Sequence, residues 1–463
     1  MSIRSFFASF CIFGFIFFNL QELNAQQKTS KTFKSGDTVC FLGDSITHGG
    51  QFHEFLQLFY ATRHPNIALT FFNCGISGDN AEGMSYRFKD DVLMHNPSHV
   101  FFMTGMNDVI RTLYFEGQAS DEVIIKRKNA LAVYKQNTDI LASIFGASQI
   151  TPIYLTPPIY DQYSKIEKEN NFGCNDALIE CSNHIKSIAN QYDATVVDLN
   201  TPMKKIMDRE LKNDSLFTII GQDRVHPKTT GHFIMFHEIL STLETPSVVA
   251  QILINLNQNN RIKTTNCSVN ELQVSKENIL FNCQENSLPF PFTKAFDTAL
   301  RLVPFQKKFN QEILQVIGLD KGSYDLFIQD KLINTFSAEQ LNDGVNLSNE
   351  FNTPQYKQAK DIMNLCQEYR KTGYQLRAVP FIAFKYLREY NGPNTLKNKK
   401  IFLDNQLKKI EGQPFYNYIK KSIHEYYQTL PRLDSLKIRL KQIEHIIHKK
   451  NKPRAMNWSI VKR

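Results

Sequence analysis

The chain has 463 residues, which is too long for one ordinary hydrophobic core, so we expect two or three domains. Hydrophobic residues make up 42% and charged residues 21% of the sequence, and these values exclude an intrinsically disordered protein. The net charge is +9, and part of it gathers near the C-terminus, at Lys449, Lys450, Lys452, Arg454, Lys462 and Arg463.

This basic cluster is most simply a solvated surface. A second interpretation is that it attracts an acidic polymer, such as a polysaccharide of uronic acids. Because aromatic residues do not alternate with the basic ones, we expect no nucleic-acid partner.

The first 25 residues have the pattern of a secretory signal. Arg4 is followed by the nearly unbroken apolar run 6–20, and Ala25 provides a small residue before Gln26. The alternative is an uncleaved membrane anchor, but the run is short for a membrane span. We therefore predict a signal peptide over 1–25 and a secreted or periplasmic protein with no stable membrane insertion after cleavage. No later segment is apolar and long enough to cross a membrane.

The cysteines do not form a disulfide framework. Of eight cysteines one lies in the N-terminal segment, and the remaining seven are sparse and odd in number. Cys267 and Cys283 flank strand-like runs and could pair, whereas Cys40 and Cys74 lie in predicted buried strands as small core residues. No pair has the spacing of a zinc site, and we predict no metal and no cofactor.

Strands and helices alternate over the first half of the chain. Buried-strand patterns, each bounded by turn residues, occur at 39–43, 67–72, 99–103, 149–155 and 195–199. Helical spacing of apolar residues occurs at 51–60, 80–94, 121–145, 176–191 and 229–243. This alternation predicts an α/β domain over 36–245, with a parallel sheet between two helical layers.

The pattern changes after about residue 246, and we predict a C-terminal accessory region of α+β type over 250–463. Weak alternation at 261–281 precedes an expected turn at 282–286, and strand-like runs at 309–319 and 324–328 complete a small β unit. Helical spacing follows at 354–369 and at 403–448. We interpret this region as packing on the first domain, with a lid or a binding module as alternatives.

A serine stands at the end of the first predicted strand, in Gly43-Asp44-Ser45. Ligands of open α/β sheets bind beyond the carboxyl ends of the strands, so Ser45 is placed to act as a nucleophile. A serine hydroxyl is inert near neutral pH unless a base accepts its proton.

His226 is the best candidate for that base, because Asp223 lies three residues before it. On one helical turn such residues share a face, so Asp223 could bind one ring nitrogen while the other faces Ser45. His48 is close to Ser45 in sequence and is the alternative base. We expect the oxyanion donors to be the backbone N–H groups of Ser45 and Gly78 and the side-chain amide of Asn107.

These motifs together resemble the four sequence blocks of the SGNH, or GDSL-type, hydrolases. The blocks are Gly43-Asp44-Ser45, Asn73-x-Gly75-x-Ser77-Gly78, Gly105-x-Asn107-Asp108 and Asp223-x-x-His226, and they occur in the family's order. The chain has Ile46 where Gly-Asp-Ser-Leu is commoner, a change that leaves the chemistry intact. It lacks the Gly-x-Ser-x-Gly motif of the α/β-hydrolase fold.

The resemblance implies a flavodoxin-like three-layer α/β/α sandwich and esterase chemistry without a metal. It makes Ser45 the nucleophile, His226 the base and Asp223 the residue that orients it, with Gly78 and Asn107 as oxyanion donors. Asp44 and Asp108 match positions that cap loops. Beyond residue 250 the resemblance to the basic family unit ends.

We therefore expect a secreted serine esterase that acts on O-acyl groups, above all O-acetyl groups, of a carbohydrate or a small molecule. A lipase, lysophospholipase or thioesterase of the same fold is the first alternative. A non-catalytic glycan-binding or scaffold protein is the second, and the complete set of site residues argues against it. No segment of the sequence indicates an oligomeric state.

Overall fold

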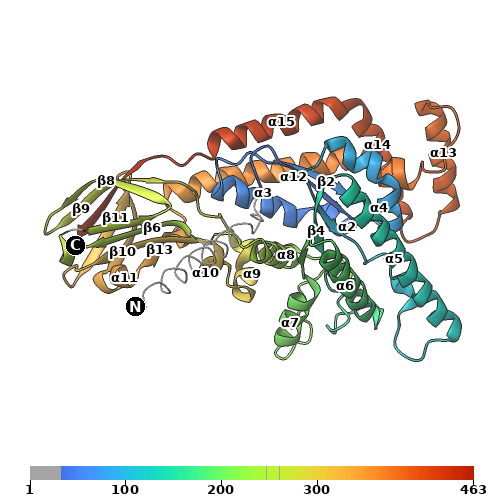
Figure 1. Ribbon diagram of the computed structural model, residues 1–463, viewed down its shortest axis with the longest axis horizontal. Coiled ribbons are helices and arrows are strands. Elements are labelled where there is room, and N and C mark those ends of the chain that lie inside the picture. The colour runs from blue at the N-terminus through green and yellow to red at the C-terminus, as the bar shows by residue number, and fades with distance from the viewer. Residues whose placement is uncertain (1–32, 247, 260) are drawn as a thin grey trace, which may run out of the picture. The chain divides into compact units, whose positions relative to one another are not determined.

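A five-stranded parallel sheet lies at the centre of the first half of the chain. A computed structural model describes residues 33–463 except 247 and 260, so the predicted signal segment 1–25 lies outside the described residues. The strand order is β2-β1-β3-β4-β5, which is the flavodoxin-like order (Figure 1). The strands are β1 (Thr38–Gly43), β2 (Thr70–Gly75), β3 (His99–Met103), β4 (Thr151–Leu155) and β5 (Thr195–Val197).

Helices cover both faces of this sheet, so the predicted fold class is confirmed. Phe41 of β1 contacts Phe52 on one face, and Phe102 of β3 contacts Phe145 on the other. The first face is covered by α3 (Gln51–Arg63) and α8 (Thr229–Thr242). The second is covered by α4 (Ala81–Arg87), α5 (Asp121–Ala147) and α6 (Cys174–Gln191). The short helix α2 (Ser45–Gly49) follows β1 directly, and α7 (Asn200–Glu210) follows β5.

Two local predictions in this half are wrong. The second strand begins at Thr70 rather than at 67, because the Ile67 N–H is used in a turn with the His64 carbonyl and cannot pair with β1. Helix α7 was not predicted at all, although Pro202 in its first turn is a typical helix start.

The residues after 245 contain two further sheets instead of one small β unit. The first has the order β13-β10-β6-β7 and the second the order β12-β11-β14-β9-β8. The first consists of β6 (Val248–Asn255), β7 (Arg261–Thr265), β10 (Gln311–Ile317) and β13 (Val345–Asn346). The second consists of β8 (Cys267–Val274), β9 (Asn278–Glu285), β11 (Ser323–Ile328), β12 (Lys331–Ser337) and β14 (Met456–Lys462).

The predicted turn at 282–286 is wrong, because β9 continues to Glu285. The chain reverses earlier, where the Ser275 N–H donates to the Asn278 carbonyl at 2.8 Å. Phe281 and Cys283 then point into a buried core, which holds the strand in register. Cys267 and Cys283 lie on the paired strands β8 and β9 as free thiols.

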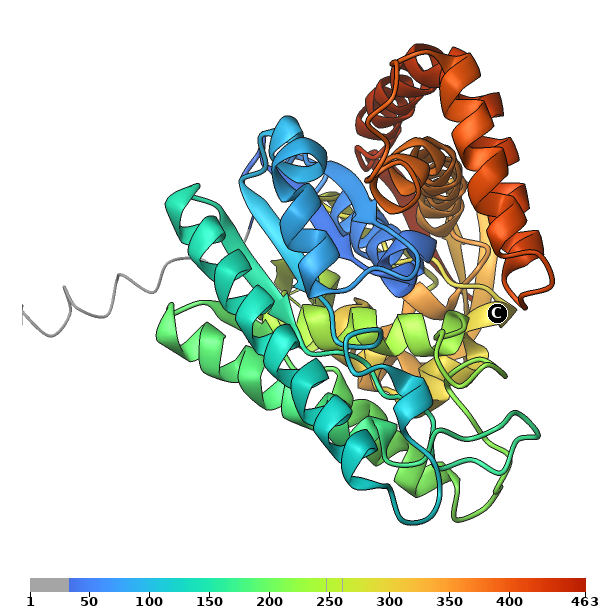
Figure 2. The ribbon, with the colours of Figure 1, turned by 90° about the vertical axis from the view of Figure 1, so that its right-hand side faces the viewer.

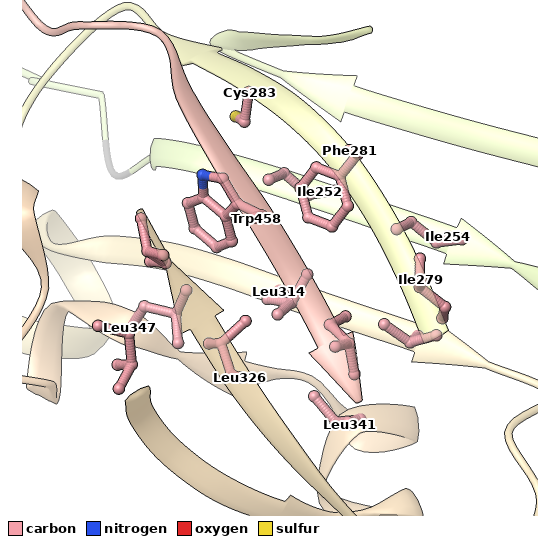
Figure 3. Close-up of a cluster of buried hydrophobic side chains, with 14 of the residues drawn as sticks. Ile252, Ile254, Ile279, Phe281, Cys283, Leu314, Leu326, Leu341, Leu347 and Trp458 are labelled. Carbon is pink, nitrogen blue, oxygen red and sulfur yellow. The ribbon is translucent and has the colours of Figure 1, made fainter. Parts of the chain in front are cut away.

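A common hydrophobic core joins these two sheets. Trp458 on β14 lies among Phe281, Leu314 and Leu326 from three other strands (Figure 3). Strand β14 pairs with β11 and β9, so the last residues of the chain occupy the middle of the second sheet. Without β14, the strands β11 and β9 of this sheet would have no common neighbour.

Helices complete the accessory region. Short helices lie between the strands: α9 (Asp297–Leu302), α10 (Phe305–Phe309) and α11 (Ala338–Asp343). Four longer ones follow: α12 (Pro354–Lys385), α13 (Leu396–Lys409), α14 (Tyr416–Thr429) and α15 (Leu433–Lys450). Figures 1 and 2 both place α12 beside the blue segment with β2 and α3, and the Tyr369 hydroxyl donates to the Phe71 carbonyl of β2 at 2.7 Å. Within 33–463, apart from 247 and 260, no helix is both long and apolar enough to span a membrane.

The single tryptophan gives a direct probe of the C-terminal core. Leu326 is 1% exposed in this core and Leu332, on the neighbouring strand, is 45% exposed. We expect Leu326→Ala to lower the free energy of unfolding by about 2–5 kcal/mol through the lost burial and the cavity. Urea unfolding followed by Trp458 fluorescence measures this, and Leu332→Ala should leave the midpoint unchanged. An unchanged midpoint in Leu326→Ala would contradict this description of the core.

Two buried carboxyl groups in the accessory region predict a pH-dependent stability. Glu285 and Glu312 are 2% and 1% exposed, and burial raises the pKa of Glu312 from 4.5 to about 7. Burial and the neighbouring Glu312 charge also raise the pKa of Glu285. Between pH 4.5 and about 7, the ordinary and the raised pKa of Glu312, the folded chain binds more protons than the unfolded chain. The free energy of unfolding should therefore fall as the pH rises through this range.

Glu312→Gln should flatten this dependence, because the amide does not titrate. The measurement is the urea midpoint of Trp458 fluorescence at about pH 5 and at about pH 7. Glu339→Gln, at an exposed position of α11, is the matched control and should keep the slope of the unchanged protein. An equal slope in Glu312→Gln and in the unchanged protein would contradict the prediction.

Candidate active site

Ser45 is the first residue of helix α2, directly beyond the carboxyl end of β1. The Asp44 side chain accepts a hydrogen bond from the Ile46 N–H at 2.9 Å and so caps this helix. Asp44 is 2% exposed, and burial raises its pKa to about 6. The role of Asp44 as a capping residue is confirmed, and it fixes the backbone that carries the serine hydroxyl.

The structure brings Ser45, His226 and Asp223 together in one chain of hydrogen bonds. The Ser45 Oγ atom lies 2.7 Å from His226 Nε2, and His226 Nδ1 lies 2.6 Å from Asp223 Oδ2. Ser45 and His226 are 181 positions apart in the sequence, so only the fold makes this contact. The side chains of His226 and Asp223 are 47% and 51% exposed, and the site is therefore open to solvent.

Asp223 and His226 lie in a turn rather than on the expected helical turn. Asp223 Oδ1 accepts the backbone N–H groups of Val225 at 3.0 Å and His226 at 2.9 Å, and Arg224 between them has a positive φ of 64°. Partial burial acts to raise the pKa of Asp223, but the hydrogen bonds from His226 and the backbone hold it well below its ordinary value. The carboxylate therefore stays charged and holds the imidazole in one orientation.

Arg224 holds this turn in place, a role that no local pattern of residues indicates. It is 3% exposed, and its guanidinium donates to four main-chain carbonyls. The acceptors lie at 2.8–3.0 Å on Lys168, Asp161, Ser164 and Ile166. Since the Arg224 carbonyl also accepts the Asp161 N–H, the turn is bound on both sides to the segment after β4.

The three expected oxyanion donors follow the carboxyl ends of the neighbouring strands β1, β2 and β3. The backbone N–H groups of Ser45 and Gly78 have no acceptor in the part of the chain that the structure describes. Gly78 is exposed and has a φ of 72°, a conformation that side chains disfavour. Asn107 donates one amide hydrogen to the Asp79 carbonyl at 2.8 Å, and its oxygen accepts from Arg111 at 2.9 Å. An amide has two N–H donors, so the second remains for a ligand.

Asp108 supports these donors as a capping residue, as predicted. Its carboxylate accepts from the Ala81 N–H at 2.8 Å, from the Thr104 hydroxyl at 2.8 Å and from the Gly105 N–H at 2.9 Å. It is 8% exposed. These bonds tie the loop after β3 to the start of α4, so that Asn107 and Gly78 face the same region.

The other histidine near Ser45 has a different partner. His48 Nδ1 lies 2.9 Å from the Ser77 hydroxyl and accepts the Ser77 N–H, and its ring stacks on Tyr374. Burial lowers the pKa of His48 to about 3. The structure therefore pairs His226, and not His48, with the Ser45 hydroxyl. No group of three or more acidic, histidine or cysteine side chains gathers like a metal site among the described residues.

Comparisons with known proteins show what the first half of the chain is similar to. Residues 39–239 match the family described as GDSL-like Lipase/Acylhydrolase. The chain is similar to the acetylxylan esterase of Geobacillus stearothermophilus, with 23% identity over 222 residues that cover 44% of this chain and 93% of the relative. A crystal structure of that esterase matches 46% of this chain and 96% of its own, with 23% identity and a TM-score of 0.37.

A second solved structure extends over both halves of the chain. It is a gut microbial diltiazem-metabolizing enzyme with 26% identity and a TM-score of 0.83, and the match covers 93% of this chain and 99% of that one. The fold of the accessory region beyond residue 239 therefore recurs in a solved enzyme together with that of the parallel sheet.

The observed hydrogen bond predicts which histidine is essential. We expect His226→Ala to lower kcat for 4-nitrophenyl acetate by at least about 10³-fold, because His226 Nε2 is the group hydrogen-bonded to the serine hydroxyl. The circular dichroism and the urea midpoint should stay unchanged, since His226 is 47% exposed. His445→Ala, at an exposed position of α15, is the control and should keep full activity. Full activity in His226→Ala would transfer the role of base to another residue.

Proposed function

We propose that this chain, an esterase of the GDSL-like lipase/acylhydrolase family, removes O-acetyl groups from carbohydrate, with Ser45 as nucleophile and His226 as base. The observation that carries this proposal is the unbroken contact of Ser45 Oγ, His226 and Asp223 at 2.7 and 2.6 Å. Each distance is within hydrogen-bond reach, so the geometry supports proton transfer before any substrate is bound.

In the first half of the proposed reaction the acetyl group moves to Ser45. The Ser45 oxygen bonds to the ester carbonyl carbon as His226 Nε2 takes the hydroxyl proton. The carbonyl oxygen becomes an oxyanion, and the N–H groups of Ser45 and Gly78 and the amide of Asn107 stabilise it. The bond to the sugar oxygen then breaks, and His226 returns its proton to that oxygen as the alcohol leaves.

In the second half water takes the place of the alcohol. His226 accepts a proton from water, the hydroxide oxygen bonds to the acetyl carbon, and the ester bond to Ser45 breaks. The proton returns to Ser45, and acetic acid leaves and ionises to acetate in solution. Asp223 stays charged throughout and stabilises the imidazolium that forms twice in each cycle.

The solvent exposure of the site favours an ester substrate whose alcohol part is large. His226 and Asp223 are about half exposed. An open site of this kind suits a polysaccharide that extends beyond the nucleophile better than a substrate that must be enclosed. The similarity to an acetylxylan esterase supports acetyl as the acyl group. We further propose secretion, because the pattern of Arg4, the apolar run 6–20 and Ala25 is typical of a secretory signal.

The alternative is a lipase, lysophospholipase or thioesterase. A long acyl chain requires an apolar groove beside the nucleophile, whereas the direct neighbours of Ser45, Gly78 and Asn107 include the polar residues Asp44, Ser77, Asp79 and Asp108. This observation favours a short acyl group over a long one.

A panel of esters tests the proposed substrate class. We expect acetate release from acetylated xylan or another acetylated polysaccharide, and hydrolysis of 4-nitrophenyl acetate at least about tenfold faster than of the decanoate. Diltiazem, which carries an acetyl ester, is a further substrate to include. Ser45→Ala is the control and should lose turnover of every ester. Faster hydrolysis of the decanoate would favour the lipase alternative, and equal turnover in Ser45→Ala would contradict the mechanism.

A further inference from the structure

The segment that carries the proposed oxyanion donor Gly78 is held from outside the hydrolase fold. Strand β2 ends at Gly75, and residues 75–79, here called the 75–79 loop, connect it to α4. Gly78 is exposed and has a left-handed φ of 72°. Its N–H direction therefore depends on what fixes the peptide groups of this loop.

Helix α12 of the accessory region binds this segment at three main-chain carbonyls. The Tyr369 hydroxyl donates to Phe71 O at 2.7 Å, Arg377 Nε donates to Gly75 O at 3.0 Å, and Lys385 Nζ donates to Gly78 O at 2.9 Å. All three acceptors belong to the edge strand β2 or to the loop after it.

The spacing of the donors explains why one helix can do this. Tyr369, Arg377 and Lys385 are each eight positions apart, which is a rise of about 12 Å per step. The carbonyls of Phe71 and Gly75 are four strand residues apart, which is about 13 Å. The first two donors of α12 therefore match the spacing of the two carbonyls on β2, and the third donor lies at the loop.

A buried ion cluster joins the helix to both ends of the 75–79 loop. Arg377 binds Asp91 with two bonds of 2.7 Å, and Arg87 binds both Asp91 and Asp79. Arg377, Asp91 and Arg87 are each no more than 5% exposed. Lys385 Nζ also lies 3.6 Å from Asp79 Oδ1. With three basic and two acidic side chains, these five groups leave one positive charge unbalanced beside the loop.

We propose that Lys385, supported by Arg377, is a positioning residue of the esterase reaction. By binding the Gly78 carbonyl, the ammonium fixes the peptide on one side of Gly78 and keeps the N–H on its other side directed toward the oxyanion. Its charge also favours negative charge at that point. This inference rests on the proposed function and assigns a part in the reaction to a helix that lies outside the family match of 39–239.

Lys385 gives the sharpest test, because it is exposed on the surface and the buried Asp79 keeps its ion pair with Arg87 at 2.8 Å when Lys385 is changed. We expect Lys385→Met to lower kcat for 4-nitrophenyl acetate about tenfold while KM stays within about twofold, since an oxyanion contact forms only in the transition state. Lys385→Arg should recover most of the loss. Lys360→Met, at an exposed position of the same helix, should match the unchanged enzyme.

A tetrahedral phosphonate ester of 4-nitrophenol provides a second readout. It phosphonylates the active serine, and its oxygen occupies the place of the oxyanion. The rate of 4-nitrophenol release should fall in Lys385→Met by about the same factor as kcat, which a general loss of stability would not produce. The urea midpoint, measured in parallel, should stay unchanged.

The outcomes separate this inference from the function on which it rests. Unchanged kcat in Lys385→Met, or an equal loss in Lys360→Met, would overturn the positioning role while the esterase remains. A loss of kcat in Lys385→Met that Lys385→Arg does not recover would also overturn it. Full turnover in Ser45→Ala would instead overturn the proposed serine mechanism.

Discussion

The ion pair between Asp91 and Arg377 is the interaction on which the rest of the structure depends. It joins the helical segment after α4 to helix α12 across 286 positions of sequence, and both side chains are almost wholly buried. Burial alone would raise the pKa of Asp91, but Arg377 and Arg87 hold it below its ordinary value. A buried charge without its partner is strongly destabilising, so the two halves of the chain must fold around each other.

This interaction gives the accessory region a role at the edge of the hydrolase sheet, although the region lies far from that sheet in sequence. The edge strand of a sheet has unpaired carbonyl groups that need partners or water. In this protein α12 supplies those partners along β2, and the same contacts end at the loop that carries Gly78. Protection of the sheet edge and placement of the proposed oxyanion donor are therefore two results of one packing arrangement.

The sequence was sufficient for the parallel sheet and for the residues around Ser45, because those depend on local patterns. A buried strand followed by Gly43, Gly75 or Gly105 predicts the strand end, and parallel strands bring such ends to one edge. The contacts of Arg224 and Arg377 could not be predicted, since an arginine that binds distant carbonyls leaves no periodic signal. The prediction of the accessory sheets was incomplete for a related reason. Strand β14 lies between β9 and β11, and that order depends on pairings between residues more than 100 positions apart.

The central claim is that Ser45 carries the acetyl group during turnover, and the most direct measurement is of that covalent state. The enzyme is mixed with an excess of 4-nitrophenyl acetate, quenched in acid during turnover, digested and analysed by mass spectrometry. The account predicts the mass of one acetyl group on the peptide that contains Ser45, and its absence from the same peptide of Ser45→Ala. Turnover with an acetyl group on another residue, or with none on the protein, would contradict the account.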